Sequence, residues 1–206
     1  MCVVSQIEQI NEYWTGGPCV SPETFGAKQK CWYQSTKDID AYIRKNFGAT
    51  HLAAENGHLS TWSTSHQGAV ALITLLDQFT RNLYRASIDA YRNDDQARKI
   101  AVDVFLKDDC SQLTVPQTIL LVHPLHHAED IELQLLGLRM MEHLKKHGSR
   151  QWQDVIKKNL TSILNHEKII ARFGRFPHRN QILGRDSTVA ERRYLSNDKR
   201  NYGQAR

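Results

Sequence analysis

The sequence has few of the features that mark secreted, membrane-spanning or metal-stapled proteins. Its four cysteines form no C-x-x-C pair and no spacing typical of a zinc knuckle or a disulfide framework; they are Cys2, Cys19, Cys31 and Cys110. The N-terminal segment lacks the basic region and the apolar run of a secretory signal. The longest strongly apolar stretch, residues 69–76, is far shorter than the roughly 20 residues needed to span a bilayer. We therefore predict reduced thiols in a soluble, cytoplasmic protein that has no membrane association.

Glycine and proline are also scarce, with 11 and 5 among 206 residues. Together they make about 8% of the chain, against roughly 12% in average usage, and this favours helices over a turn-rich β architecture. No segment shows the clean two-residue alternation of a strand, and no Pro, Gly or Ser-rich linker divides the chain. With 40% hydrophobic residues the chain can bury a substantial core, so we predict a single all-α domain over residues 1–206.

The excess of positive charge is confined to one end of the chain. There are 27 Lys and Arg against 22 Asp and Glu, a net charge of +5. The last 36 residues, 171–206, hold nine basic and three acidic residues, so their balance is +6 and the rest of the chain carries −1. Nucleic-acid binding through a broad basic surface is therefore not expected. RNA binding through the C-terminal arginines with Tyr194 or Tyr202 is a minor alternative, because no RNA-binding module is recognisable.

Apolar side chains recur at helical spacing along most of the chain. The pattern predicts helices over residues 6–14, 38–47, 67–84, 88–106, 125–147 and 152–173, and a short last helix from 188. The first helix thus falls within 1–14, residues 15–34 are expected to be irregular, and 196–206 a frayed polar tail. Gly48 and Gly174 are expected to follow helix ends, and Thr188 with Glu191 to form a capping box. Helices of similar length joined by short loops favour antiparallel hairpins.

Charged groups occupy apolar positions of the predicted helix 67–84. Asp77 lies on a largely apolar stripe, Arg81 follows one turn later, and Arg85 a further turn on. A charge in such a half-buried position needs a partner. Two interpretations are open: Asp77 and Arg81 form a structural ion pair that braces the helices, or the two arginines bind a ligand.

Histidines and carboxylates follow one another in the stretch His-Pro-Leu-His-His-Ala-Glu-Asp. Helical geometry from Pro124 onward places His126, Glu129 and Asp130 on one face and His127 on a neighbouring face. An imidazole paired with a carboxylate can act as general acid and base near neutral pH. Acidic residues also stabilise the first turn of any helix, which explains the carboxylates and leaves the histidines unexplained.

Arginines alternate with phenylalanines in the segment Arg-Phe-Gly-Arg-Phe-Pro-His-Arg-Asn. Four guanidinium groups fall within 14 residues, those of Arg172, Arg175, Arg179 and Arg185. Such crowding is unfavourable unless carboxylates or a bound anion neutralise it. A solvated basic loop is the alternative, although the phenylalanines favour burial. His166, just upstream among isoleucines, is either a core histidine or a site residue.

Metal binding and nucleotide binding have little support in the sequence. There is no H-E-x-x-H, no H-x-H and no calcium-loop spacing, so a metal site would need ligands from distant segments such as His127, Glu129, His166 and His178. Phosphate-binding loops and nucleophile elbows are absent as well. We predict neither a metal nor a cofactor.

Three motifs resemble a bacterial family called domain of unknown function 924. They are Leu-Leu-Asp-Gln-Phe-Thr-Arg-Asn-Leu-Tyr-Arg from Leu75, the His-Pro-Leu-His-His-Ala-Glu-Asp stretch, and Phe-Gly-Arg-Phe-Pro-His-Arg-Asn with Leu183-Gly-Arg-x-Ser-Thr. The resemblance extends from Tyr13 to about Leu195 and implies a helical fold of the tetratricopeptide-like superfamily with no established reaction. The family's pattern usually has proline at the position of Thr80. It also implies that His127 and Glu129, rather than His126, are the site residues.

Our leading hypothesis is a pocket inside a right-handed, tetratricopeptide-like superhelix that binds a small anionic metabolite, phosphorylated or carboxylated, with possible acid–base hydrolase or transferase chemistry. The candidate catalytic residues are His127, Glu129 and His178. The candidate ligand-binding residues are Asp77, Arg81, Asn82, Arg85, His166, Arg175, Arg179, Asn180 and Arg185. The alternative is a module that binds a protein or peptide partner, in which the polar motifs form a structural ion-pair network.

Overall fold

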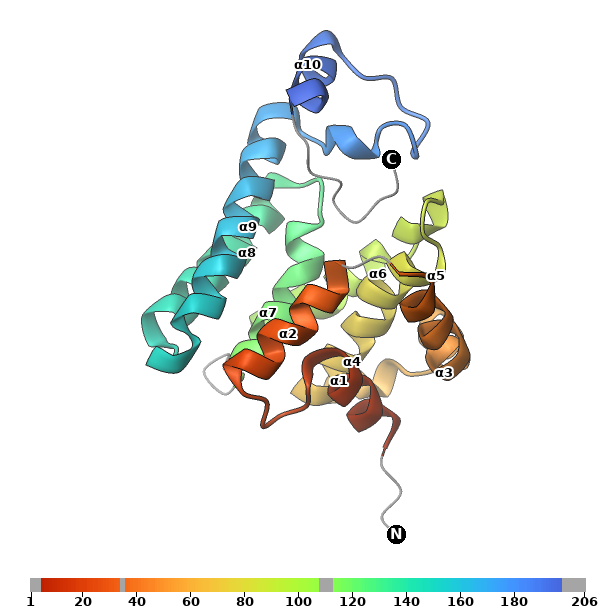
Figure 1. Cartoon of the computed structure of the whole chain (residues 1–206), viewed down its shortest axis with the longest axis vertical. Helices are drawn as coiled ribbons and strands as arrows, with labels where there is room; N and C mark the ends of the chain where they lie inside the picture. Colours follow the sequence, from red (N-terminus) through yellow and green to blue (C-terminus); the bar gives the residue numbers. More distant parts are fainter. Residues whose placement is uncertain (1–4, 34–35, 108–112, 198–206) are drawn as a thin grey trace.

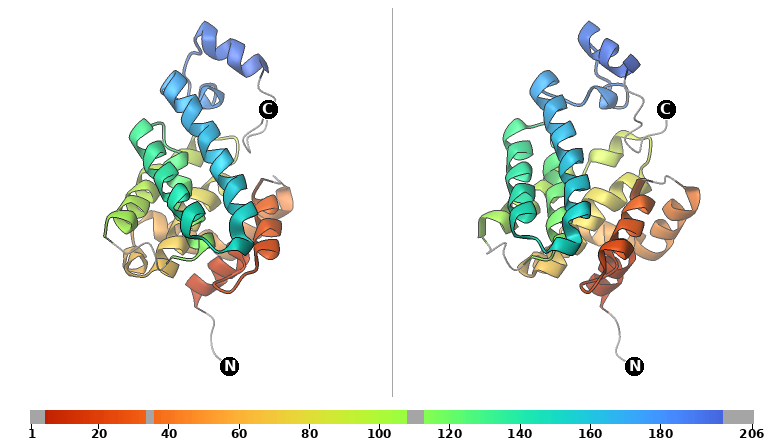
Figure 2. Two further views of the ribbon diagram at one scale, coloured as in Figure 1. Left: turned by 90° about the vertical axis from the view of Figure 1, so that its left-hand side faces the viewer. Right: turned by 60° about the vertical axis from the view of Figure 1, so that its left-hand side comes forward.

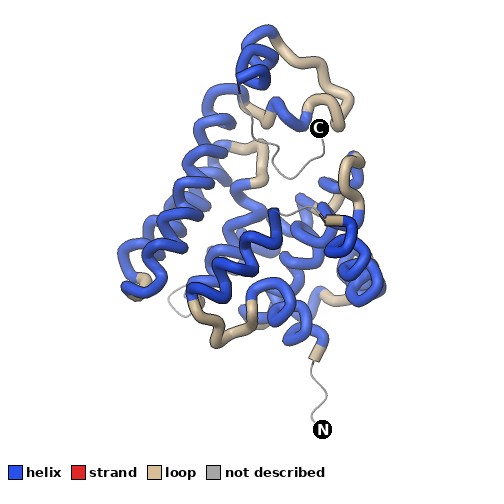
Figure 3. The backbone as a smooth tube through the Cα atoms, in the orientation of Figure 1, coloured by secondary structure: helices blue, strands red, loops and turns tan. Residues whose placement is uncertain are grey.

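The computed structural model describes residues 5–33, 36–107 and 113–197, and within these ranges the chain forms helices and no strands (Figure 3). The prediction of an all-α fold is confirmed. The α-helices are α1 (Gln6–Thr15), α2 (Pro22–Tyr33), α3 (Lys37–Glu55), α4 (His66–Ile73), α5 (Thr80–Leu83), α6 (Asp94–Lys107), α7 (Val115–His126), α8 (Ile131–His147), α9 (Gln153–Phe173) and α10 (Val189–Asn197). A π-helical turn, η2 (Thr74–Phe79), joins α4 to α5, and short 3-10 turns occur at Ser60–Thr64, Ile88–Tyr91, Arg150–Trp152 and Pro177–Arg179.

The helix that combines α4, η2 and α5 forms the centre of the molecule, because residues 68–80 are all buried. Helices α1, α6 and α7 pack against α4, and α3 packs against η2 and α5. Helices α7, α8 and α9 lie side by side, and α8 and α9 form an antiparallel hairpin (Figures 1 and 2). The segment after α9 and helix α10 lie at the end of the molecule opposite α1 (Figure 1). The tetratricopeptide-like superhelix stays a prediction.

The prediction that residues 15–34 are irregular is wrong for most of that range, because α2 occupies Pro22–Tyr33. The apolar pattern of α2 is too weak to predict a helix from the sequence, and packing against residues far along the chain stabilises the helix. Phe25 is fully buried, and the Trp32 ring stacks on Trp14 with centroids 5.5 Å apart. The Trp32 Nε1–H group also donates a 3.0 Å hydrogen bond to the Trp14 carbonyl. Tertiary contacts therefore outweigh local sequence preference here.

The predicted long helix over 125–147 is also wrong, because it is divided at residues 127–130. Helix α7 begins at Val115, behind a capping box of Thr114 and Gln117, and continues through Pro124 to His126. Asp130 then caps α8, since its Oδ1 accepts hydrogen bonds from the backbone N–H groups of the next turn at 2.8 and 3.1 Å. His126, Glu129 and Asp130 therefore do not share one helix face.

The other helix boundaries predicted from local sequence signals are confirmed in some places and wrong in others. The prediction that Gly48 ends a helix is wrong, because α3 continues through it to Glu55. The predicted helix 88–106 consists of the turn Ile88–Tyr91 and then α6. Gly174 follows α9 in the left-handed region with φ 67°, as predicted, and Thr188 and Glu191 exchange the two hydrogen bonds of a capping box. Of the predicted tail, residues 198–206 lie outside the described residues.

None of the helices in the described ranges combines the length and apolar character that crossing a bilayer requires. Cys19 and Cys31 carry free thiols, and Cys2 and Cys110 lie outside the described residues.

Candidate functional site

An inner cavity of about 120 Å³ lies where η2, α7 and α9 meet the turn Pro177–Arg179. Its wall contains three arginines and five histidines, and no carboxylate lies among the described residues that line it. The lining residues are Trp32, Gln78, Arg81, Asn82, Arg85, Tyr91, His123, His126, His127, Ser162, His166, His178 and Arg179. The cavity thus combines cations, imidazoles and amide groups, residue types that core packing seldom collects.

Asp77 lies behind this wall and pairs with His127, which is part of the wall. Asp77 is fully buried in the π turn, and its Oδ1 is 2.8 Å from His127 Nδ1. The Gln78 amide donates to Asp77 Oδ2. Because the Asp77 carboxylate can only accept a hydrogen bond, His127 Nδ1 carries the imidazole proton and donates it, and Nε2 carries the lone pair. His127 Nε2 makes no hydrogen bond within the described part of the chain.

Burial lowers the pKa of three cavity histidines, His123, His126 and His127, and so favours their neutral form. His126 lies among three other imidazoles, with ring centroids 4.4 Å from His127, 4.9 Å from His123 and 4.9 Å from His166. Burial first, and the neighbouring positive groups second, lower the pKa of both His126 and His127 well below its usual value. His126, which the sequence interpretation ranked below His127, lines the cavity equally.

Arg81 is compensated by two carboxylates. Its Nη1 is 3.3 Å from Asp77 Oδ1, and the guanidinium binds Asp94 through both nitrogens at 2.9 and 3.2 Å. Burial alone lowers the pKa of Arg81, but the two carboxylates outweigh it and raise the pKa above its usual value. The ion pair between Asp77 and Arg81, one of the two interpretations of the sequence, is therefore present, with Asp94 as an additional partner.

Arg85 is compensated in the same way by Asp40 of α3. Its Nε and Nη2 donate to the two carboxylate oxygens of Asp40, both at 2.8 Å, and the Asn82 amide donates to Asp40 Oδ1 at 2.8 Å. Burial raises the pKa of Asp40, while the bonds from Arg85 and Asn82 lower it by more, so the net pKa is below its usual value. The sequence offered no signal for this partner, which lies far from Arg85 along the chain.

Besides Asp77, four of the predicted site residues do not line the inner cavity. Arg185 binds Glu129 through both Nη atoms at 2.5 and 2.9 Å, and Glu129 also accepts from the Phe176 N–H at 2.8 Å. Arg175 binds Glu191 through Nε and Nη2 at 2.7 and 2.9 Å. Asn180 donates to Ser187. These pairs fasten the segment after α9 to the body and to α10.

Arg179 differs from the other arginines of this region. It is only 7% exposed, and its guanidinium carbon lies 4.8 Å from the Tyr91 ring centroid and 4.5 Å from that of Phe176. Its Nη1 donates to the His127 carbonyl at 2.9 Å, while Nε has no partner within the described residues. Within the same ranges no carboxylate lies within ion-pair distance of it. Burial and the nearby Arg81 lower the pKa of Arg179.

The sequence profile of a bacterial family of unknown function, DUF924, matches residues 10–199. The chain belongs to DUF924. A solved structure of a protein of unknown function from Agrobacterium tumefaciens is 29% identical to it, with a TM-score of 0.76 over 93% of this chain and 97% of that one. No curated protein matches the chain. Neither the DUF924 family nor the structure from Agrobacterium tumefaciens has an assigned function, so a function for this chain rests on the chemistry of the cavity.

The sequence motifs of this DUF924 chain predicted some of the residues that line the inner cavity and did not predict others. Arg81, Asn82, Arg85, His127, His166, His178 and Arg179 were predicted and line it. The cavity is also lined by residues that were not predicted as site residues: Trp32, Gln78, Tyr91, His123, His126 and Ser162. Trp32 lay in a segment taken as irregular, and Tyr91 in a 3-10 turn taken as helix, so neither had a usable signal. His123 did have one, since it belongs to the histidine-rich motif.

A second, outer cavity of about 380 Å³ shares Tyr91, His127 and Arg179 with the inner one. Glu129 and Asp94 line this outer cavity together with His127, and neither carboxylate lines the inner cavity. Neither cavity holds a group of three or more His, Cys, Asp or Glu residues arranged to bind a metal ion, as far as the described residues extend. His127, His166 and His178 accordingly do not form such a group.

Proposed function

We propose that this DUF924 chain binds a small anionic metabolite, phosphorylated or carboxylated, in the inner cavity. The observation that supports this best is Arg179, a buried guanidinium without a carboxylate partner in the described part of the chain. A buried charge is costly unless an opposite charge lies close to it. Its neighbours Arg81 and Arg85 each have such a partner inside the protein. An anionic ligand would supply the one that Arg179 lacks.

The polar atoms around the cavity also fit an anion. Besides Arg179 Nε, the Tyr91 hydroxyl and His126 Nδ1 are buried and have no hydrogen-bond partner among the described residues. Buried polar groups in proteins are nearly always paired, so a cluster of unpaired ones beside a cavity indicates a bound group. A phosphate or carboxylate offers several acceptor oxygens, and a guanidinium can bind two of them at once.

The Asp77–His127 pair extends the proposal to acid–base chemistry. Asp77 orients the imidazole and fixes its tautomer, so the unprotonated Nε2 can take a proton from a water molecule or a hydroxyl group. Arg179 and Arg81 would stabilise the negative charge that develops on the attacked group, as hydrolysis or group transfer requires. His178, which lines the same cavity, stays a prediction as a second proton-transfer group. Glu129 has no part in this step, because its carboxylate is bound by Arg185.

A partner-binding module is the rival function. In its favour, Arg81, Arg85, Arg175 and Arg185 belong to internal ion pairs, as a structural network requires. Against it, the exposed large apolar side chains of the described residues are spread over several elements rather than gathered on one helix pair; they are Tyr42, Leu52, Ile88, Leu106, Leu164 and Val189. We keep the tetratricopeptide-like superhelix and a cytoplasmic location as parts of the proposal, the latter because of the two exposed free thiols.

A thermal-shift screen with inorganic phosphate and a panel of phosphorylated and carboxylated metabolites tests the proposal. Binding to the folded state stabilises it by about 2.7 kcal/mol when the ligand is at a hundredfold excess over Kd. We expect at least one anion to stabilise the native chain and the control Arg139→Met, whose arginine is exposed on α8, but not Arg179→Met. If every anion leaves the native chain unchanged, or stabilises Arg179→Met equally, the proposed site is wrong.

A further inference from the structure

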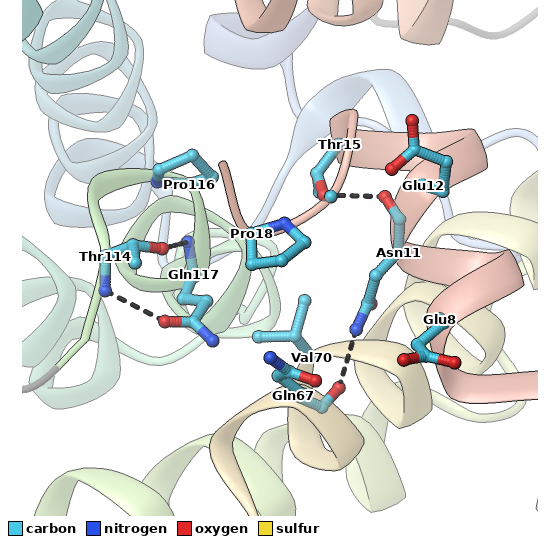
Figure 4. A pocket seen from close by; sticks show the side chains of 11 residues that line it. Glu8, Asn11, Glu12, Thr15, Pro18, Gln67, Val70, Thr114, Pro116 and Gln117 are labelled. Carbon is cyan, nitrogen blue, oxygen red and sulfur yellow. Dashed lines mark hydrogen bonds between the residues drawn. The ribbon is translucent and has the colours of Figure 1, made fainter. Parts of the chain in front are cut away.

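A third cavity, of about 270 Å³, lies between α1, the start of α4 and the start of α7 and shares no lining residue with the inner one (Figure 4). Two glutamates of α1, Glu8 and Glu12, line it, and no lysine or arginine does so among the described residues. Both carboxylates are exposed, and they lie one turn apart on the same helix. Like charges at this spacing repel each other, so the cavity wall carries an unfavourable pair.

Neither carboxylate is neutralised within the described part of the protein. Glu8 uses one oxygen, Oε2, to accept from the Ser5 N–H and hydroxyl groups at the start of α1. Its Oε1 and both oxygens of Glu12 make no hydrogen bond or ion pair within the described ranges. The Glu12 carboxylate lies over Gly17, where a Cβ atom would collide with Oε2. The loop after α1 thus leaves room for the carboxylate at the cavity edge.

One of the residues that line the same cavity, Asn11, carries a buried acceptor that is unpaired among the described residues. Asn11 is only 7% exposed, and its side chain extends from α1 toward Gln67, whose carbonyl accepts from Asn11 Nδ2 at 3.0 Å (Figure 4). Asn11 Oδ1 has no partner in the described part of the chain. An unpaired buried acceptor is costly and calls for an N–H or O–H donor. This observation is independent of the two carboxylates and indicates the same kind of ligand.

We infer that this cavity binds an alkylammonium group, with an ammonium N–H donating to Asn11 Oδ1 and the positive charge lying beside Glu8 and Glu12. The side chains of Val70, Pro18 and Pro116 line the cavity and offer apolar contacts to a hydrocarbon stem. A short primary amine fits this combination of acceptor, charge and apolar wall. The same group could come from a free amine or from a lysine side chain.

Calorimetric titration with n-butylammonium chloride, and separately with an end-blocked lysine tripeptide, tests the inference. We expect saturable binding of at least one of the two, and the tighter of the two identifies the source of the amine. Glu12→Gln is expected to raise Kd about tenfold, and the matched control Glu142→Gln, exposed on α8, to leave it unchanged. Asn11→Leu is expected to abolish binding.

Two results would overturn the inference. Butanol, which lacks the charge, should not bind; equal binding of butanol and butylammonium would reduce the cavity to an apolar groove. No saturation by either amine in the native chain would overturn it as well. If Asn11→Leu fails to fold, the exposed Glu12 decides, because its substitution removes a charge without disturbing the core.

Discussion

At the scale of single residues, the arginines of the inner cavity fall into two kinds, with and without a carboxylate partner among the described residues. Arg81 lies between Asp77 and Asp94, whereas Arg179 lies between two aromatic rings. Cation–π contacts are worth roughly 0.5–2 kcal/mol and do not replace a carboxylate. Arg179 is therefore the arginine whose charge a bound anion would stabilise most.

This difference predicts opposite responses to the same substitution. Arg81→Met leaves two buried carboxylates without their cation and should lower the free energy of unfolding by about 3–5 kcal/mol. Arg179→Met leaves no carboxylate unpaired and should change it by less than about 1 kcal/mol, because lost hydrogen bonding offsets relief of a buried charge. Urea unfolding of the two variants measures this. Equal, large destabilisation in both would mean that Arg179 is part of a structural network.

The pKa values of the buried histidines predict sensitivity to acid. The pKa of His51, His123, His126 and His127 is lowered in the folded chain, chiefly by burial. The unfolded chain therefore binds more protons below the ordinary value of about 6.5, so stability is complete above that pH and declines as pH falls. Urea unfolding between about pH 8 and pH 5 should show this decline, and His126→Leu should flatten it. A flat native profile would contradict the neutral imidazole cluster.

At the scale of helices, local sequence signals predicted some of the helix ends that contacts between neighbouring residues determine. The end of α9 at Gly174 and the capping box of α10 follow from neighbouring residues, and both were predictable. Helix α2 and the break between α7 and α8 were not. The first depends on Trp32 packing on Trp14, and the second on Asp130 capping α8 and on Gln134 donating to the carbonyls of His126 and Ala128. The Trp14–Trp32 contact joins separate helices and leaves no periodic trace in the sequence. The contacts of Asp130 and Gln134 are local, but the apolar spacing continues across them and predicts one uninterrupted helix.

Two helical glycines give a matched prediction at this scale. Gly48 lies inside α3, where a Cβ atom would have no neighbouring atom within 4 Å, so Gly48→Ala should raise the free energy of unfolding by roughly 0.5–1 kcal/mol. Gly68 lies in the first turn of α4, where a Cβ atom would collide with the Trp62 carbonyl oxygen. Gly68→Ala should therefore destabilise the protein. Thermal unfolding compares the two variants. An increase in stability for Gly68→Ala would contradict this prediction, because it would show that the Ser60–Thr64 turn moves to accommodate the added methyl group.

At the scale of the whole molecule, polar contacts join segments that are far apart in sequence. Asp77 of η2 meets His127 after α7, Arg85 meets Asp40 of α3, and Glu129 meets Arg185 beyond α9. The sequence predicted half-buried positions for the charged groups of the central helix, Asp77, Arg81 and Arg85, because they interrupt its apolar pattern. It could not predict their partners, and so it placed Glu129 and Arg185 among the site residues although they bind each other.

The Glu129 contacts predict a coupling across the molecule. Glu129 holds both Arg185 and the Phe176 N–H, which fix the segment that carries Arg179. Glu129→Ala should speed hydrogen exchange of the amides in residues 175–188 and weaken anion binding, while protection in α8 and α9 stays unchanged. Exchange monitored by mass spectrometry measures both regions. Unchanged exchange in 175–188 would show that Glu129 does not hold this segment.

The central claim is that an anion occupies the inner cavity beside Arg179. Diffraction from crystals soaked in selenate tests it most directly, because the anomalous signal of selenium locates the anion without reference to the protein. We predict an anomalous peak inside the inner cavity, within hydrogen-bond distance of the Arg179 guanidinium and the Tyr91 hydroxyl. Selenate bound only at surface lysines and arginines, with no peak in the inner cavity, would contradict the account.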